Sequence, residues 1–181
     1  MKAVGFFRSL PIDEEQSLLD LELNFPAPGL SDLLVKIEAI SVNPADAKRR
    51  IRTSPSADLG EPMILGYDAV GVVTKAGAAV VGFKPGDRVW YAGDVNRNGS
   101  YAEYQCVDFR LASLAPKTTT PEAAASMPLT ALTSWEMLFE RLQIQQFFGA
   151  PSLLVIGAAG GVGSLTIQMA RALTGAKVIA T

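Results

Sequence analysis

The residues with the clearest chemical signature form a glycine-rich turn, Val155-Ile156-Gly157-Ala158-Ala159-Gly160-Gly161-Val162-Gly163. A short apolar strand, Ser152–Ile156, leads into this turn, and a helix is predicted after it over Ser164–Leu173. Small residues at such a turn let the backbone approach a pyrophosphate, and the N–H groups at the start of the helix attract its negative charge. The turn therefore predicts a dinucleotide site. The expected binding residues are Gly157, Ala158, Ala159, Gly160, Gly161, Val162 and Gly163.

The turn matches the usual fingerprint G-x-G-x-x-G incompletely, because Ala158 stands at the first glycine position. Gly160 and Gly163 occupy the second and third positions, and the third glycine allows a helix to pack closely on a strand. The alternative is a tight strand-to-helix turn that binds nothing. The order strand, turn, helix, strand favours phosphate binding.

The composition limits the other chemistry that is available. The chain has no histidine and one cysteine, Cys106, so it lacks the commonest general base and zinc ligand and forms no internal disulfide. With 16 basic and 18 acidic residues, it has no general attraction for nucleic acid or for an anionic membrane. No apolar stretch reaches the roughly 20 residues of a membrane span. We expect a soluble, cytoplasmic protein with neither nucleic acid nor membrane as partner.

The densest run of positive charge is Lys48-Arg49-Arg50-Ile51-Arg52. It falls at the end of a short helix predicted over Pro44–Arg52, where basic side chains interact favourably with the helix dipole. We interpret it as the solvated face of that helix. The alternatives are steering of an anionic cofactor or a weak contact with nucleic acid.

Short apolar runs separated by turn residues fill the chain to about Pro116, which is typical of a compact β-barrel-like domain. The predicted strands are Lys2–Phe7, Leu18–Leu23, Leu33–Val42, Ala69–Lys75, Asp87–Ala92, Tyr101–Val107 and Arg110–Leu114.

The pattern changes at Thr120-Pro121-Glu122, a helix start with an N-cap, a proline and an acid in the first turn. A helical pattern interrupted by Pro128 continues to about Phe147, and a second buried strand is predicted at Lys177–Ala180. The fold class is therefore mixed β and α/β, ending in one strand–helix–strand unit. Such a unit leaves both sheet faces and an edge uncovered. We expect a shortened chain, or a domain completed by another chain.

Taken together and in order, the motifs are specific. The chain resembles the zinc-free quinone oxidoreductase branch of the medium-chain dehydrogenase/reductase superfamily. Proteins of this branch also carry the name zinc-type alcohol dehydrogenase-like. The resemblance implies a GroES-like catalytic domain at residues 1–120. It also implies a linking helix and the start of a truncated Rossmann domain at residues 121–181. The matching segments are 41–46, 64–73, 82–90, 99–104, 128–133 and the glycine turn.

The resemblance also indicates whether the protein holds zinc. Zinc-dependent relatives have Cys where this chain has Asn43 and His where it has Tyr67. The four cysteines of the family's structural zinc lobe are absent between Asp87 and Gly99. A catalytic zinc needs about three protein ligands. The resemblance therefore implies no zinc, and hydride transfer from the nicotinamide straight to an electron-poor quinone or α,β-unsaturated carbonyl.

Three residues are expected at the reacting groups by this resemblance. Asn43 and Thr130 would lie near the nicotinamide or substrate oxygen as hydrogen-bond donors, and Tyr67 would line the cleft. Each has a plainer alternative: Asn43-Pro44 as a turn and helix entry, Thr130 bonded to helix backbone, and Tyr67 as packing. Asp46 is interpreted as structural, either capping or pairing with an arginine.

The cofactor expected by resemblance is NADPH, with NADH as the second choice. The residues that distinguish them follow the second strand, where Thr181 stands, and Thr181 is included in the cofactor site. A homodimer through the Rossmann sheets is one expected assembly. The alternatives to a reductase are a GroES-like module that is inactive alone and a non-catalytic binding protein.

Overall fold

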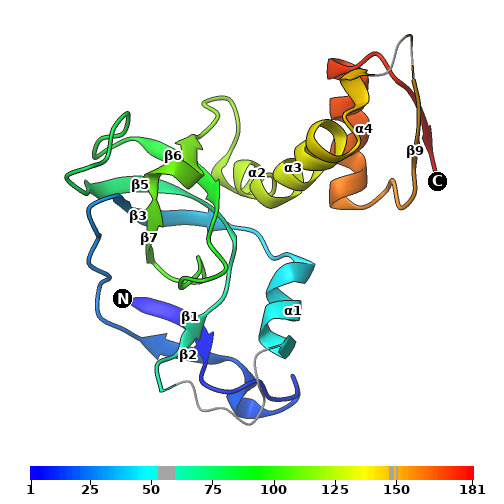
Figure 1. The fold of residues 1–181 in the computed structure, drawn as a ribbon. Coiled ribbons are helices and arrows are strands. Elements are labelled where there is room, and N and C mark those ends of the chain that lie inside the picture. Colours follow the sequence, from blue (N-terminus) through cyan, green and yellow to red (C-terminus); the bar gives the residue numbers. More distant parts are fainter. Residues whose placement is uncertain (53–59, 147–148, 150) are drawn as a thin grey trace. The chain divides into compact units, whose positions relative to one another are not determined.

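The computed structural model describes residues 1–52, 60–146, 149 and 151–181. These residues form two compact units, Met1–Ser126 and Met127–Thr181 (Figure 1). The first unit extends past residue 120 because helix α2 (Pro121–Ala125) packs on the sheet of that unit, with Ala124 and Ala125 buried against Val70. The functional assignment of the two parts remains a prediction.

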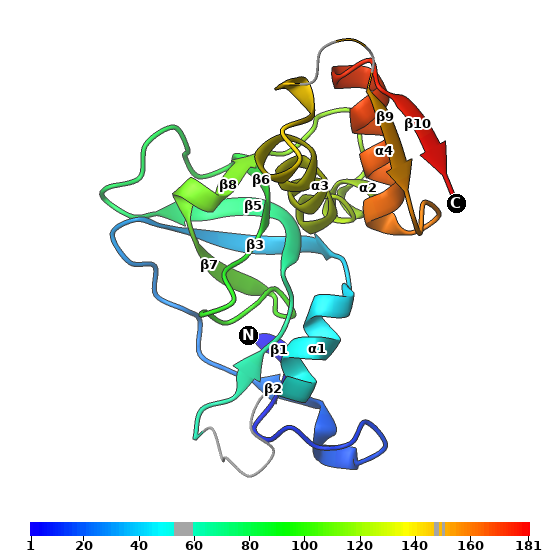
Figure 2. The same ribbon diagram turned by 45° about the vertical axis from the view of Figure 1, so that its right-hand side comes forward.

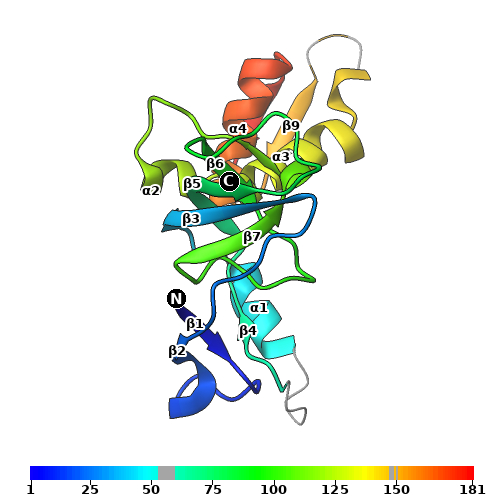
Figure 3. The ribbon, with the colours of Figure 1, turned by 90° about the vertical axis from the view of Figure 1, so that its left-hand side faces the viewer.

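A five-stranded antiparallel sheet dominates the first unit, in the order β7-β3-β5-β6-β8. Its long central strands, β3 and β5, lie side by side with β7 next to β3 (Figure 3). Alternate apolar residues such as Leu33, Val35 and Val73 point into one core and are fully buried. The strands are β3 (Asp32–Ile40), β5 (Asp68–Ala76), β6 (Arg88–Ala92), β7 (Tyr104–Asp108) and β8 (Ala112–Leu114).

A smaller antiparallel sheet, in the order β2-β1-β4, completes this unit. It contains β1 (Lys2–Phe6), β2 (Leu19–Glu22) and β4 (Met63–Ile64), and two short 3-10 helices lie at Glu15–Ser17 and Phe109–Leu111. Among the described strands the sheets stay open, so the expected barrel-like domain is not a closed barrel. The β4 strand was not predicted, because two residues are too few to show a period of two.

Two predicted helix starts are confirmed, at Pro44 and at Pro121. Helix α1 spans Pro44–Arg52 as expected. Thr120 caps α2, its Oγ1 accepting a hydrogen bond from the Ala123 N–H at 3.3 Å. The side chain of Cys106, on β7, is half-buried.

The second unit is a helix run followed by a strand–turn–helix–strand unit. The run comprises α3 (Pro128–Trp135), a π-helical segment at Glu136–Arg141 and a 3-10 turn at Ile144–Gln146, and the predicted end near Phe147 lies outside the described residues. Strands β9 (Ser152–Val155) and β10 (Lys177–Ala180) are parallel, and α4 (Gly161–Leu173) covers one of their faces (Figure 2).

The expectation that both faces of this sheet are uncovered is wrong for one face. Leu138, from the π-helical segment, and Ala170, from α4, are fully buried there beside Leu153 and Val178. The helix run before β9 supplies the extra cover. The opposite face keeps Leu154 and Ile179 paired in register and about half exposed.

In the part of the chain that the structure describes, no helix has both the length and the apolar character needed to cross a membrane.

Candidate functional site

Asn43 precedes α1 and is buried, with its side chain turned away from the helix that it introduces. Its Nδ2 donates to Asp68 Oδ2 at 2.7 Å and to Ser41 Oγ at 3.3 Å. Ser41 Oγ in turn donates to Asp68 Oδ2 at 2.7 Å. The Asn43 amide group thus already donates within the chain, and its Oδ1 is an acceptor. The role of Asn43 as a hydrogen-bond donor to a ligand stays a prediction.

Asp46 supplies the cap that Asn43 does not. Its Oδ2 accepts from the Asn43 backbone N–H at 2.7 Å, which is the reciprocal half of a capping box. Its Oδ1 accepts from the Gly66 N–H at 3.1 Å, so one carboxylate ties the start of α1 to the residue before Tyr67. The structural interpretation of Asp46 as a cap is confirmed.

Gly66 can only be glycine in this arrangement. Its φ is +106°, and a Cβ would stand 2.3 Å from Ser100 Oγ. This backbone conformation carries the half-buried Tyr67 to the wall of a cavity of about 360 Å³, which is shared with residues of α1 and with Val95. The Tyr67 carbonyl accepts from the Gly93 N–H at 2.8 Å and fixes the backbone there.

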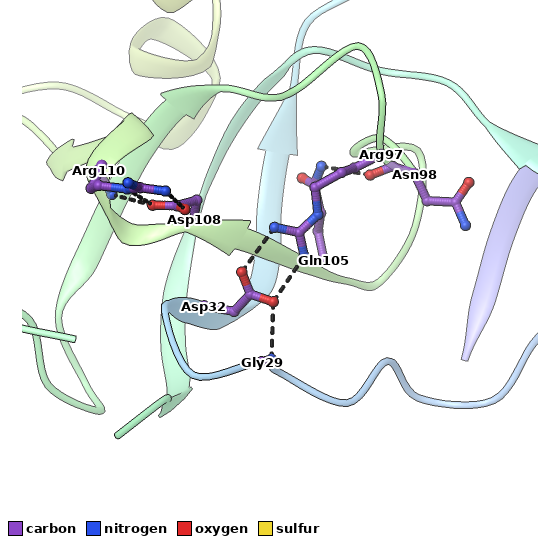
Figure 4. Close-up of polar contacts among 7 residues, drawn as sticks. All are labelled: Gly29, Asp32, Arg97, Asn98, Gln105, Asp108 and Arg110. Atoms are coloured by element: carbon purple, nitrogen blue, oxygen red, sulfur yellow. Dashed lines mark hydrogen bonds and ion pairs between the residues drawn. The ribbon is translucent and has the colours of Figure 1, made fainter. Parts of the chain in front are cut away.

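The loop between β6 and β7 is anchored by an ion pair (Figure 4). Arg97 makes two 2.8 Å hydrogen bonds to Asp32, one from each terminal nitrogen to each carboxylate oxygen. Gln105 Nε2 also donates to the Asn98 carbonyl at 3.0 Å. The hydrogen bonds from Arg97 lower the pKa of Asp32 below its ordinary value and outweigh the opposing effect of burial. The loop therefore holds Val95 in a fixed place at the cavity.

At the glycine turn, the first two amides are hydrogen-bonded within the chain. The N–H groups of Gly157 and Ala158 both donate to the Thr181 carbonyl at 3.0 Å, which continues the pairing of β9 and β10. The amides at the start of α4, on Gly161, Val162 and Gly163, have no side-chain cap among the described residues. These are the first-turn donors that suit an anion, so this end of the turn fits a pyrophosphate.

Gly163 fulfils the packing role predicted for the third glycine. A Cβ there would lie 2.5 Å from the Gly157 carbonyl oxygen and 2.7 Å from Ala158 Cα. Gly160 is different, since a Cβ would meet only the Gly157 oxygen at 3.4 Å. A cavity of about 410 Å³ borders this turn.

Thr130 lies beside the turn. Its Oγ1 donates to the Met127 carbonyl at 3.0 Å, which is the plainer alternative considered for it, and its Cγ2 is 3.3 Å from where a Gly161 Cβ would be. Behind it, buried Ser134 and Thr166 both donate to the Val162 carbonyl, at 3.1 and 2.7 Å. These bonds join α3 to the first turn of α4.

Sequence reasoning missed Ser41, Asp68, Ser134 and Thr166 as supporting residues. Asp68 did carry a signal, because an acid beside the apolar run Ala69–Val73 must find partners when it is buried. The hydroxyl residues carried none, since their partners lie 27 to 32 positions away.

The residues at Asn43 and Tyr67 do not form a zinc donor set. Zinc favours thiolate and imidazole ligands, and the Asn43 amide is already bonded to Asp68. Over residues 1–52, 60–146, 149 and 151–181, no three His, Cys, Asp or Glu side chains are grouped so as to hold a metal. The side chains present at this place do not fit zinc.

The chain combines an open antiparallel β unit with a strand, a glycine turn, a helix and a second strand. This order of elements indicates the class of protein. Residues 29–117 match the model of the alcohol dehydrogenase GroES-like domain. The chain belongs to the medium-chain dehydrogenase/reductase superfamily and carries this GroES-like domain.

Individual relatives narrow the comparison. A zinc-type alcohol dehydrogenase-like protein of Staphylococcus epidermidis is 44% identical over 184 residues, covering 100% of this chain and 53% of that protein. The NADPH-dependent alkenal/one oxidoreductase of Arabidopsis thaliana is 39% identical, covering 90% of this chain and 43% of its own length. The chain thus spans about half the length of the relatives it matches.

Two solved structures have a similar fold over nearly the whole chain. A protein from Rhizobium etli, solved as a zinc-dependent alcohol dehydrogenase, is 46% identical with a TM-score of 0.93, covering 99% of this chain and 52% of that one. The Escherichia coli quinone oxidoreductase, solved in complex with NADPH, is 29% identical with a TM-score of 0.77 and the same coverage.

The Asp32–Arg97 ion pair predicts a pH-dependent stability difference. The folded pKa of Asp32 is lowered, so its contribution is complete above the unfolded pKa of about 3.9 and disappears as the pH falls through the lower folded value. We expect Asp32→Asn to be less stable than the wild type from pH 7 to about 5, with the gap narrowing below about pH 4. Urea unfolding at each pH measures it. Asp20→Asn, which alters an exposed carboxylate, is the control, and a gap that stays constant down to pH 2 would contradict the assignment.

The two glycines of the turn should respond differently to alanine. Gly163→Ala forces a backbone clash, and we expect it to lower the unfolding free energy by about 2 kcal/mol or more. Gly160→Ala fits with ordinary contacts and should change it by less than about 1 kcal/mol. Thermal and urea unfolding of the two variants compare them directly. Equal losses would show that close packing at Gly163 is not what the turn requires.

Proposed function

We propose that the whole protein is an NADPH-dependent reductase that transfers hydride, without zinc, to a quinone or an α,β-unsaturated carbonyl. The observation that carries this proposal is the 2.7 Å hydrogen bond from Asn43 Nδ2 to Asp68. The proposal is supported because, by the family resemblance, this amide stands where zinc-dependent relatives have a cysteine ligand. Tyr67, the residue at their histidine position, lines a cavity on the same unit.

Relatives of this chemistry support the proposal. They include the alkenal/one oxidoreductase of Arabidopsis, the 2-methylene-furan-3-one reductase of tomato at 39% identity, and the E. coli quinone oxidoreductase with NADPH. The Staphylococcus epidermidis relative is named zinc-type. For this chain we base the zinc-free proposal on the side chains of Asn43 and Tyr67, because an amide and a phenol offer zinc neither sulfur nor imidazole nitrogen.

NADPH, when bound, supplies two electrons as a hydride to the acceptor, which then takes one proton from solvent, giving NADP⁺ and the reduced acceptor. On the second unit, the amides at Gly161, Val162 and Gly163 would hold the pyrophosphate. On the first unit, the Asn43 side chain would hydrogen-bond a polar group of the cofactor or acceptor, and Tyr67 would line the place of the acceptor. The remaining rate acceleration comes from positioning.

The proposal is tested on the protein encoded by the intact gene, assayed for NADPH oxidation with 1,2-naphthoquinone and with an enone. We expect turnover with both, an unchanged rate after incubation with 1,10-phenanthroline, and less than stoichiometric zinc by elemental analysis. The chelator distinguishes metal-assisted chemistry from direct transfer. Absence of turnover across a broad acceptor panel would remove the reductase assignment, and one bound zinc per chain would remove its mechanism.

Asp68 gives a second test, because its carboxylate orients the Asn43 side chain in the proposed site. A hydrogen bond to a charged acceptor contributes about 1.5–3 kcal/mol. We expect Asp68→Asn to lower kcat about 10- to 100-fold while the KM for the acceptor changes little. Asp68→Glu, which keeps the charge, should recover part of the loss. The exposed Asp20→Asn is the control. A proportional loss of folded protein without a change in kcat per folded molecule would show a purely structural role.

A further inference from the structure

The cavity beside Tyr67 has an unusual lining. Its volume is about 360 Å³, within the range of small-molecule pockets. Three of its six lining residues are cations and none is a carboxylate. The lining residues are Ala45, Lys48, Arg49, Arg52, Tyr67 and Val95.

The basic cluster of the sequence is therefore divided between two sides of α1. Arg50 is buried, and its Nη1 donates to the Leu10 carbonyl at 2.6 Å. Lys48, Arg49 and Arg52 line the cavity instead. Lys48 and Arg52 are exposed, as expected for the solvated face of a helix, and Arg49 is half-buried. Only the buried Arg50 departs from that interpretation.

Part of the surroundings of this cavity is anchored by hydrogen bonds within the chain. The start of α1 is capped by Asp46, and its later turn is held by Arg50. Arg49 Nη1 and Nη2 both donate to the Arg97 carbonyl at 3.3 Å, and Arg97 is itself paired with Asp32. A guanidinium held in this way needs little further ordering when it meets an anion.

Lys48 and Arg52 are four residues apart on one helix, a spacing that makes their side chains neighbours. Like charges at this spacing destabilise a helix by about 0.2–0.5 kcal/mol. An anion placed between them would reverse that repulsion. The other lining residues, Ala45, Val95 and Tyr67, add apolar surface that suits the conjugated body of a ligand.

We propose that this cavity is an oxyanion subsite that binds a carboxylate or phosphate group, through Lys48 and Arg52 with Arg49 beside them. The inference rests on the proposed function in that it gives the acceptor a chemical class: an enone or quinone that carries an anionic substituent. Arginine and lysine are the side chains that recognise such groups. The same oxyanion chemistry also exists in the phosphates of NADPH, so the experiment separates the two sources.

The test uses the full-length protein and a matched pair of acceptors, 4-phenyl-3-buten-2-one and its para-carboxylate. The double variant Lys48→Gln with Arg52→Gln removes the charge and nearly keeps the size. We expect kcat/KM for the carboxylate to fall about 10-fold or more, while kcat/KM for the neutral enone changes less than about 2-fold. Lys48→Arg should keep the preference. Lys75→Gln with Lys84→Gln, two exposed lysines outside the cavity lining, is the control for lost net charge.

Equilibrium binding separates this subsite from the proposed activity. Titration calorimetry with the para-carboxylate alone needs no turnover, so a wild type that binds it and a double variant that does not would support the subsite even without reductase activity. A double variant that loses affinity for NADPH but not for NADH would assign the oxyanion to the cofactor. Equal behaviour of wild type and double variant in turnover and in both titrations would overturn the proposal.

Discussion

Asp68 is fully buried at the start of β5, and a carboxylate in that position is costly unless hydrogen-bond donors surround it. Ser41 and Asn43 both turn their side chains toward it. This requirement sets the orientation of the Asn43 amide and removes it from helix capping. Asp46 then takes over the cap and reaches Gly66 with its second oxygen. The end of β3, the start of α1 and the segment carrying Tyr67 are thus held by two carboxylates, Asp68 and Asp46.

The sequence predicted the elements that have clear local signals. Helix α1 and strand β10 have the bounds expected from their caps and apolar runs, whereas β7 begins at Tyr104, three residues later than expected. In the second unit, the helix was placed from Ser164 but begins at Gly161, because three residues of the glycine turn belong to its first turn. Short elements such as β4, stabilised by pairing with β1, carry no such signal.

The candidate site was less predictable than the fold. Residue types at Asn43 and Tyr67 could be compared with the family, but the hydrogen-bond partners that decide their chemistry come from distant positions. Asn43 was expected to donate to a ligand, and only the position of Asp68, 25 residues later, shows that its amide also donates within the chain. Likewise, the run Lys48–Arg52 indicates charge without telling which side chains share a cavity. Periodicity gives the face of a helix, not what lies opposite it.

The half-buried thiol of Cys106, on β7, is relevant if the substrates are quinones and enones, because these compounds alkylate thiolates. Burial raises the pKa of Cys106 to about 11. At neutral pH only about one molecule in ten thousand would then carry the reactive anion. Residues 1–181 hold no other cysteine and no histidine, so this part of the protein offers such electrophiles one thiol and no imidazole to alkylate. Over these residues, alkylation by the proposed acceptors would therefore be slow.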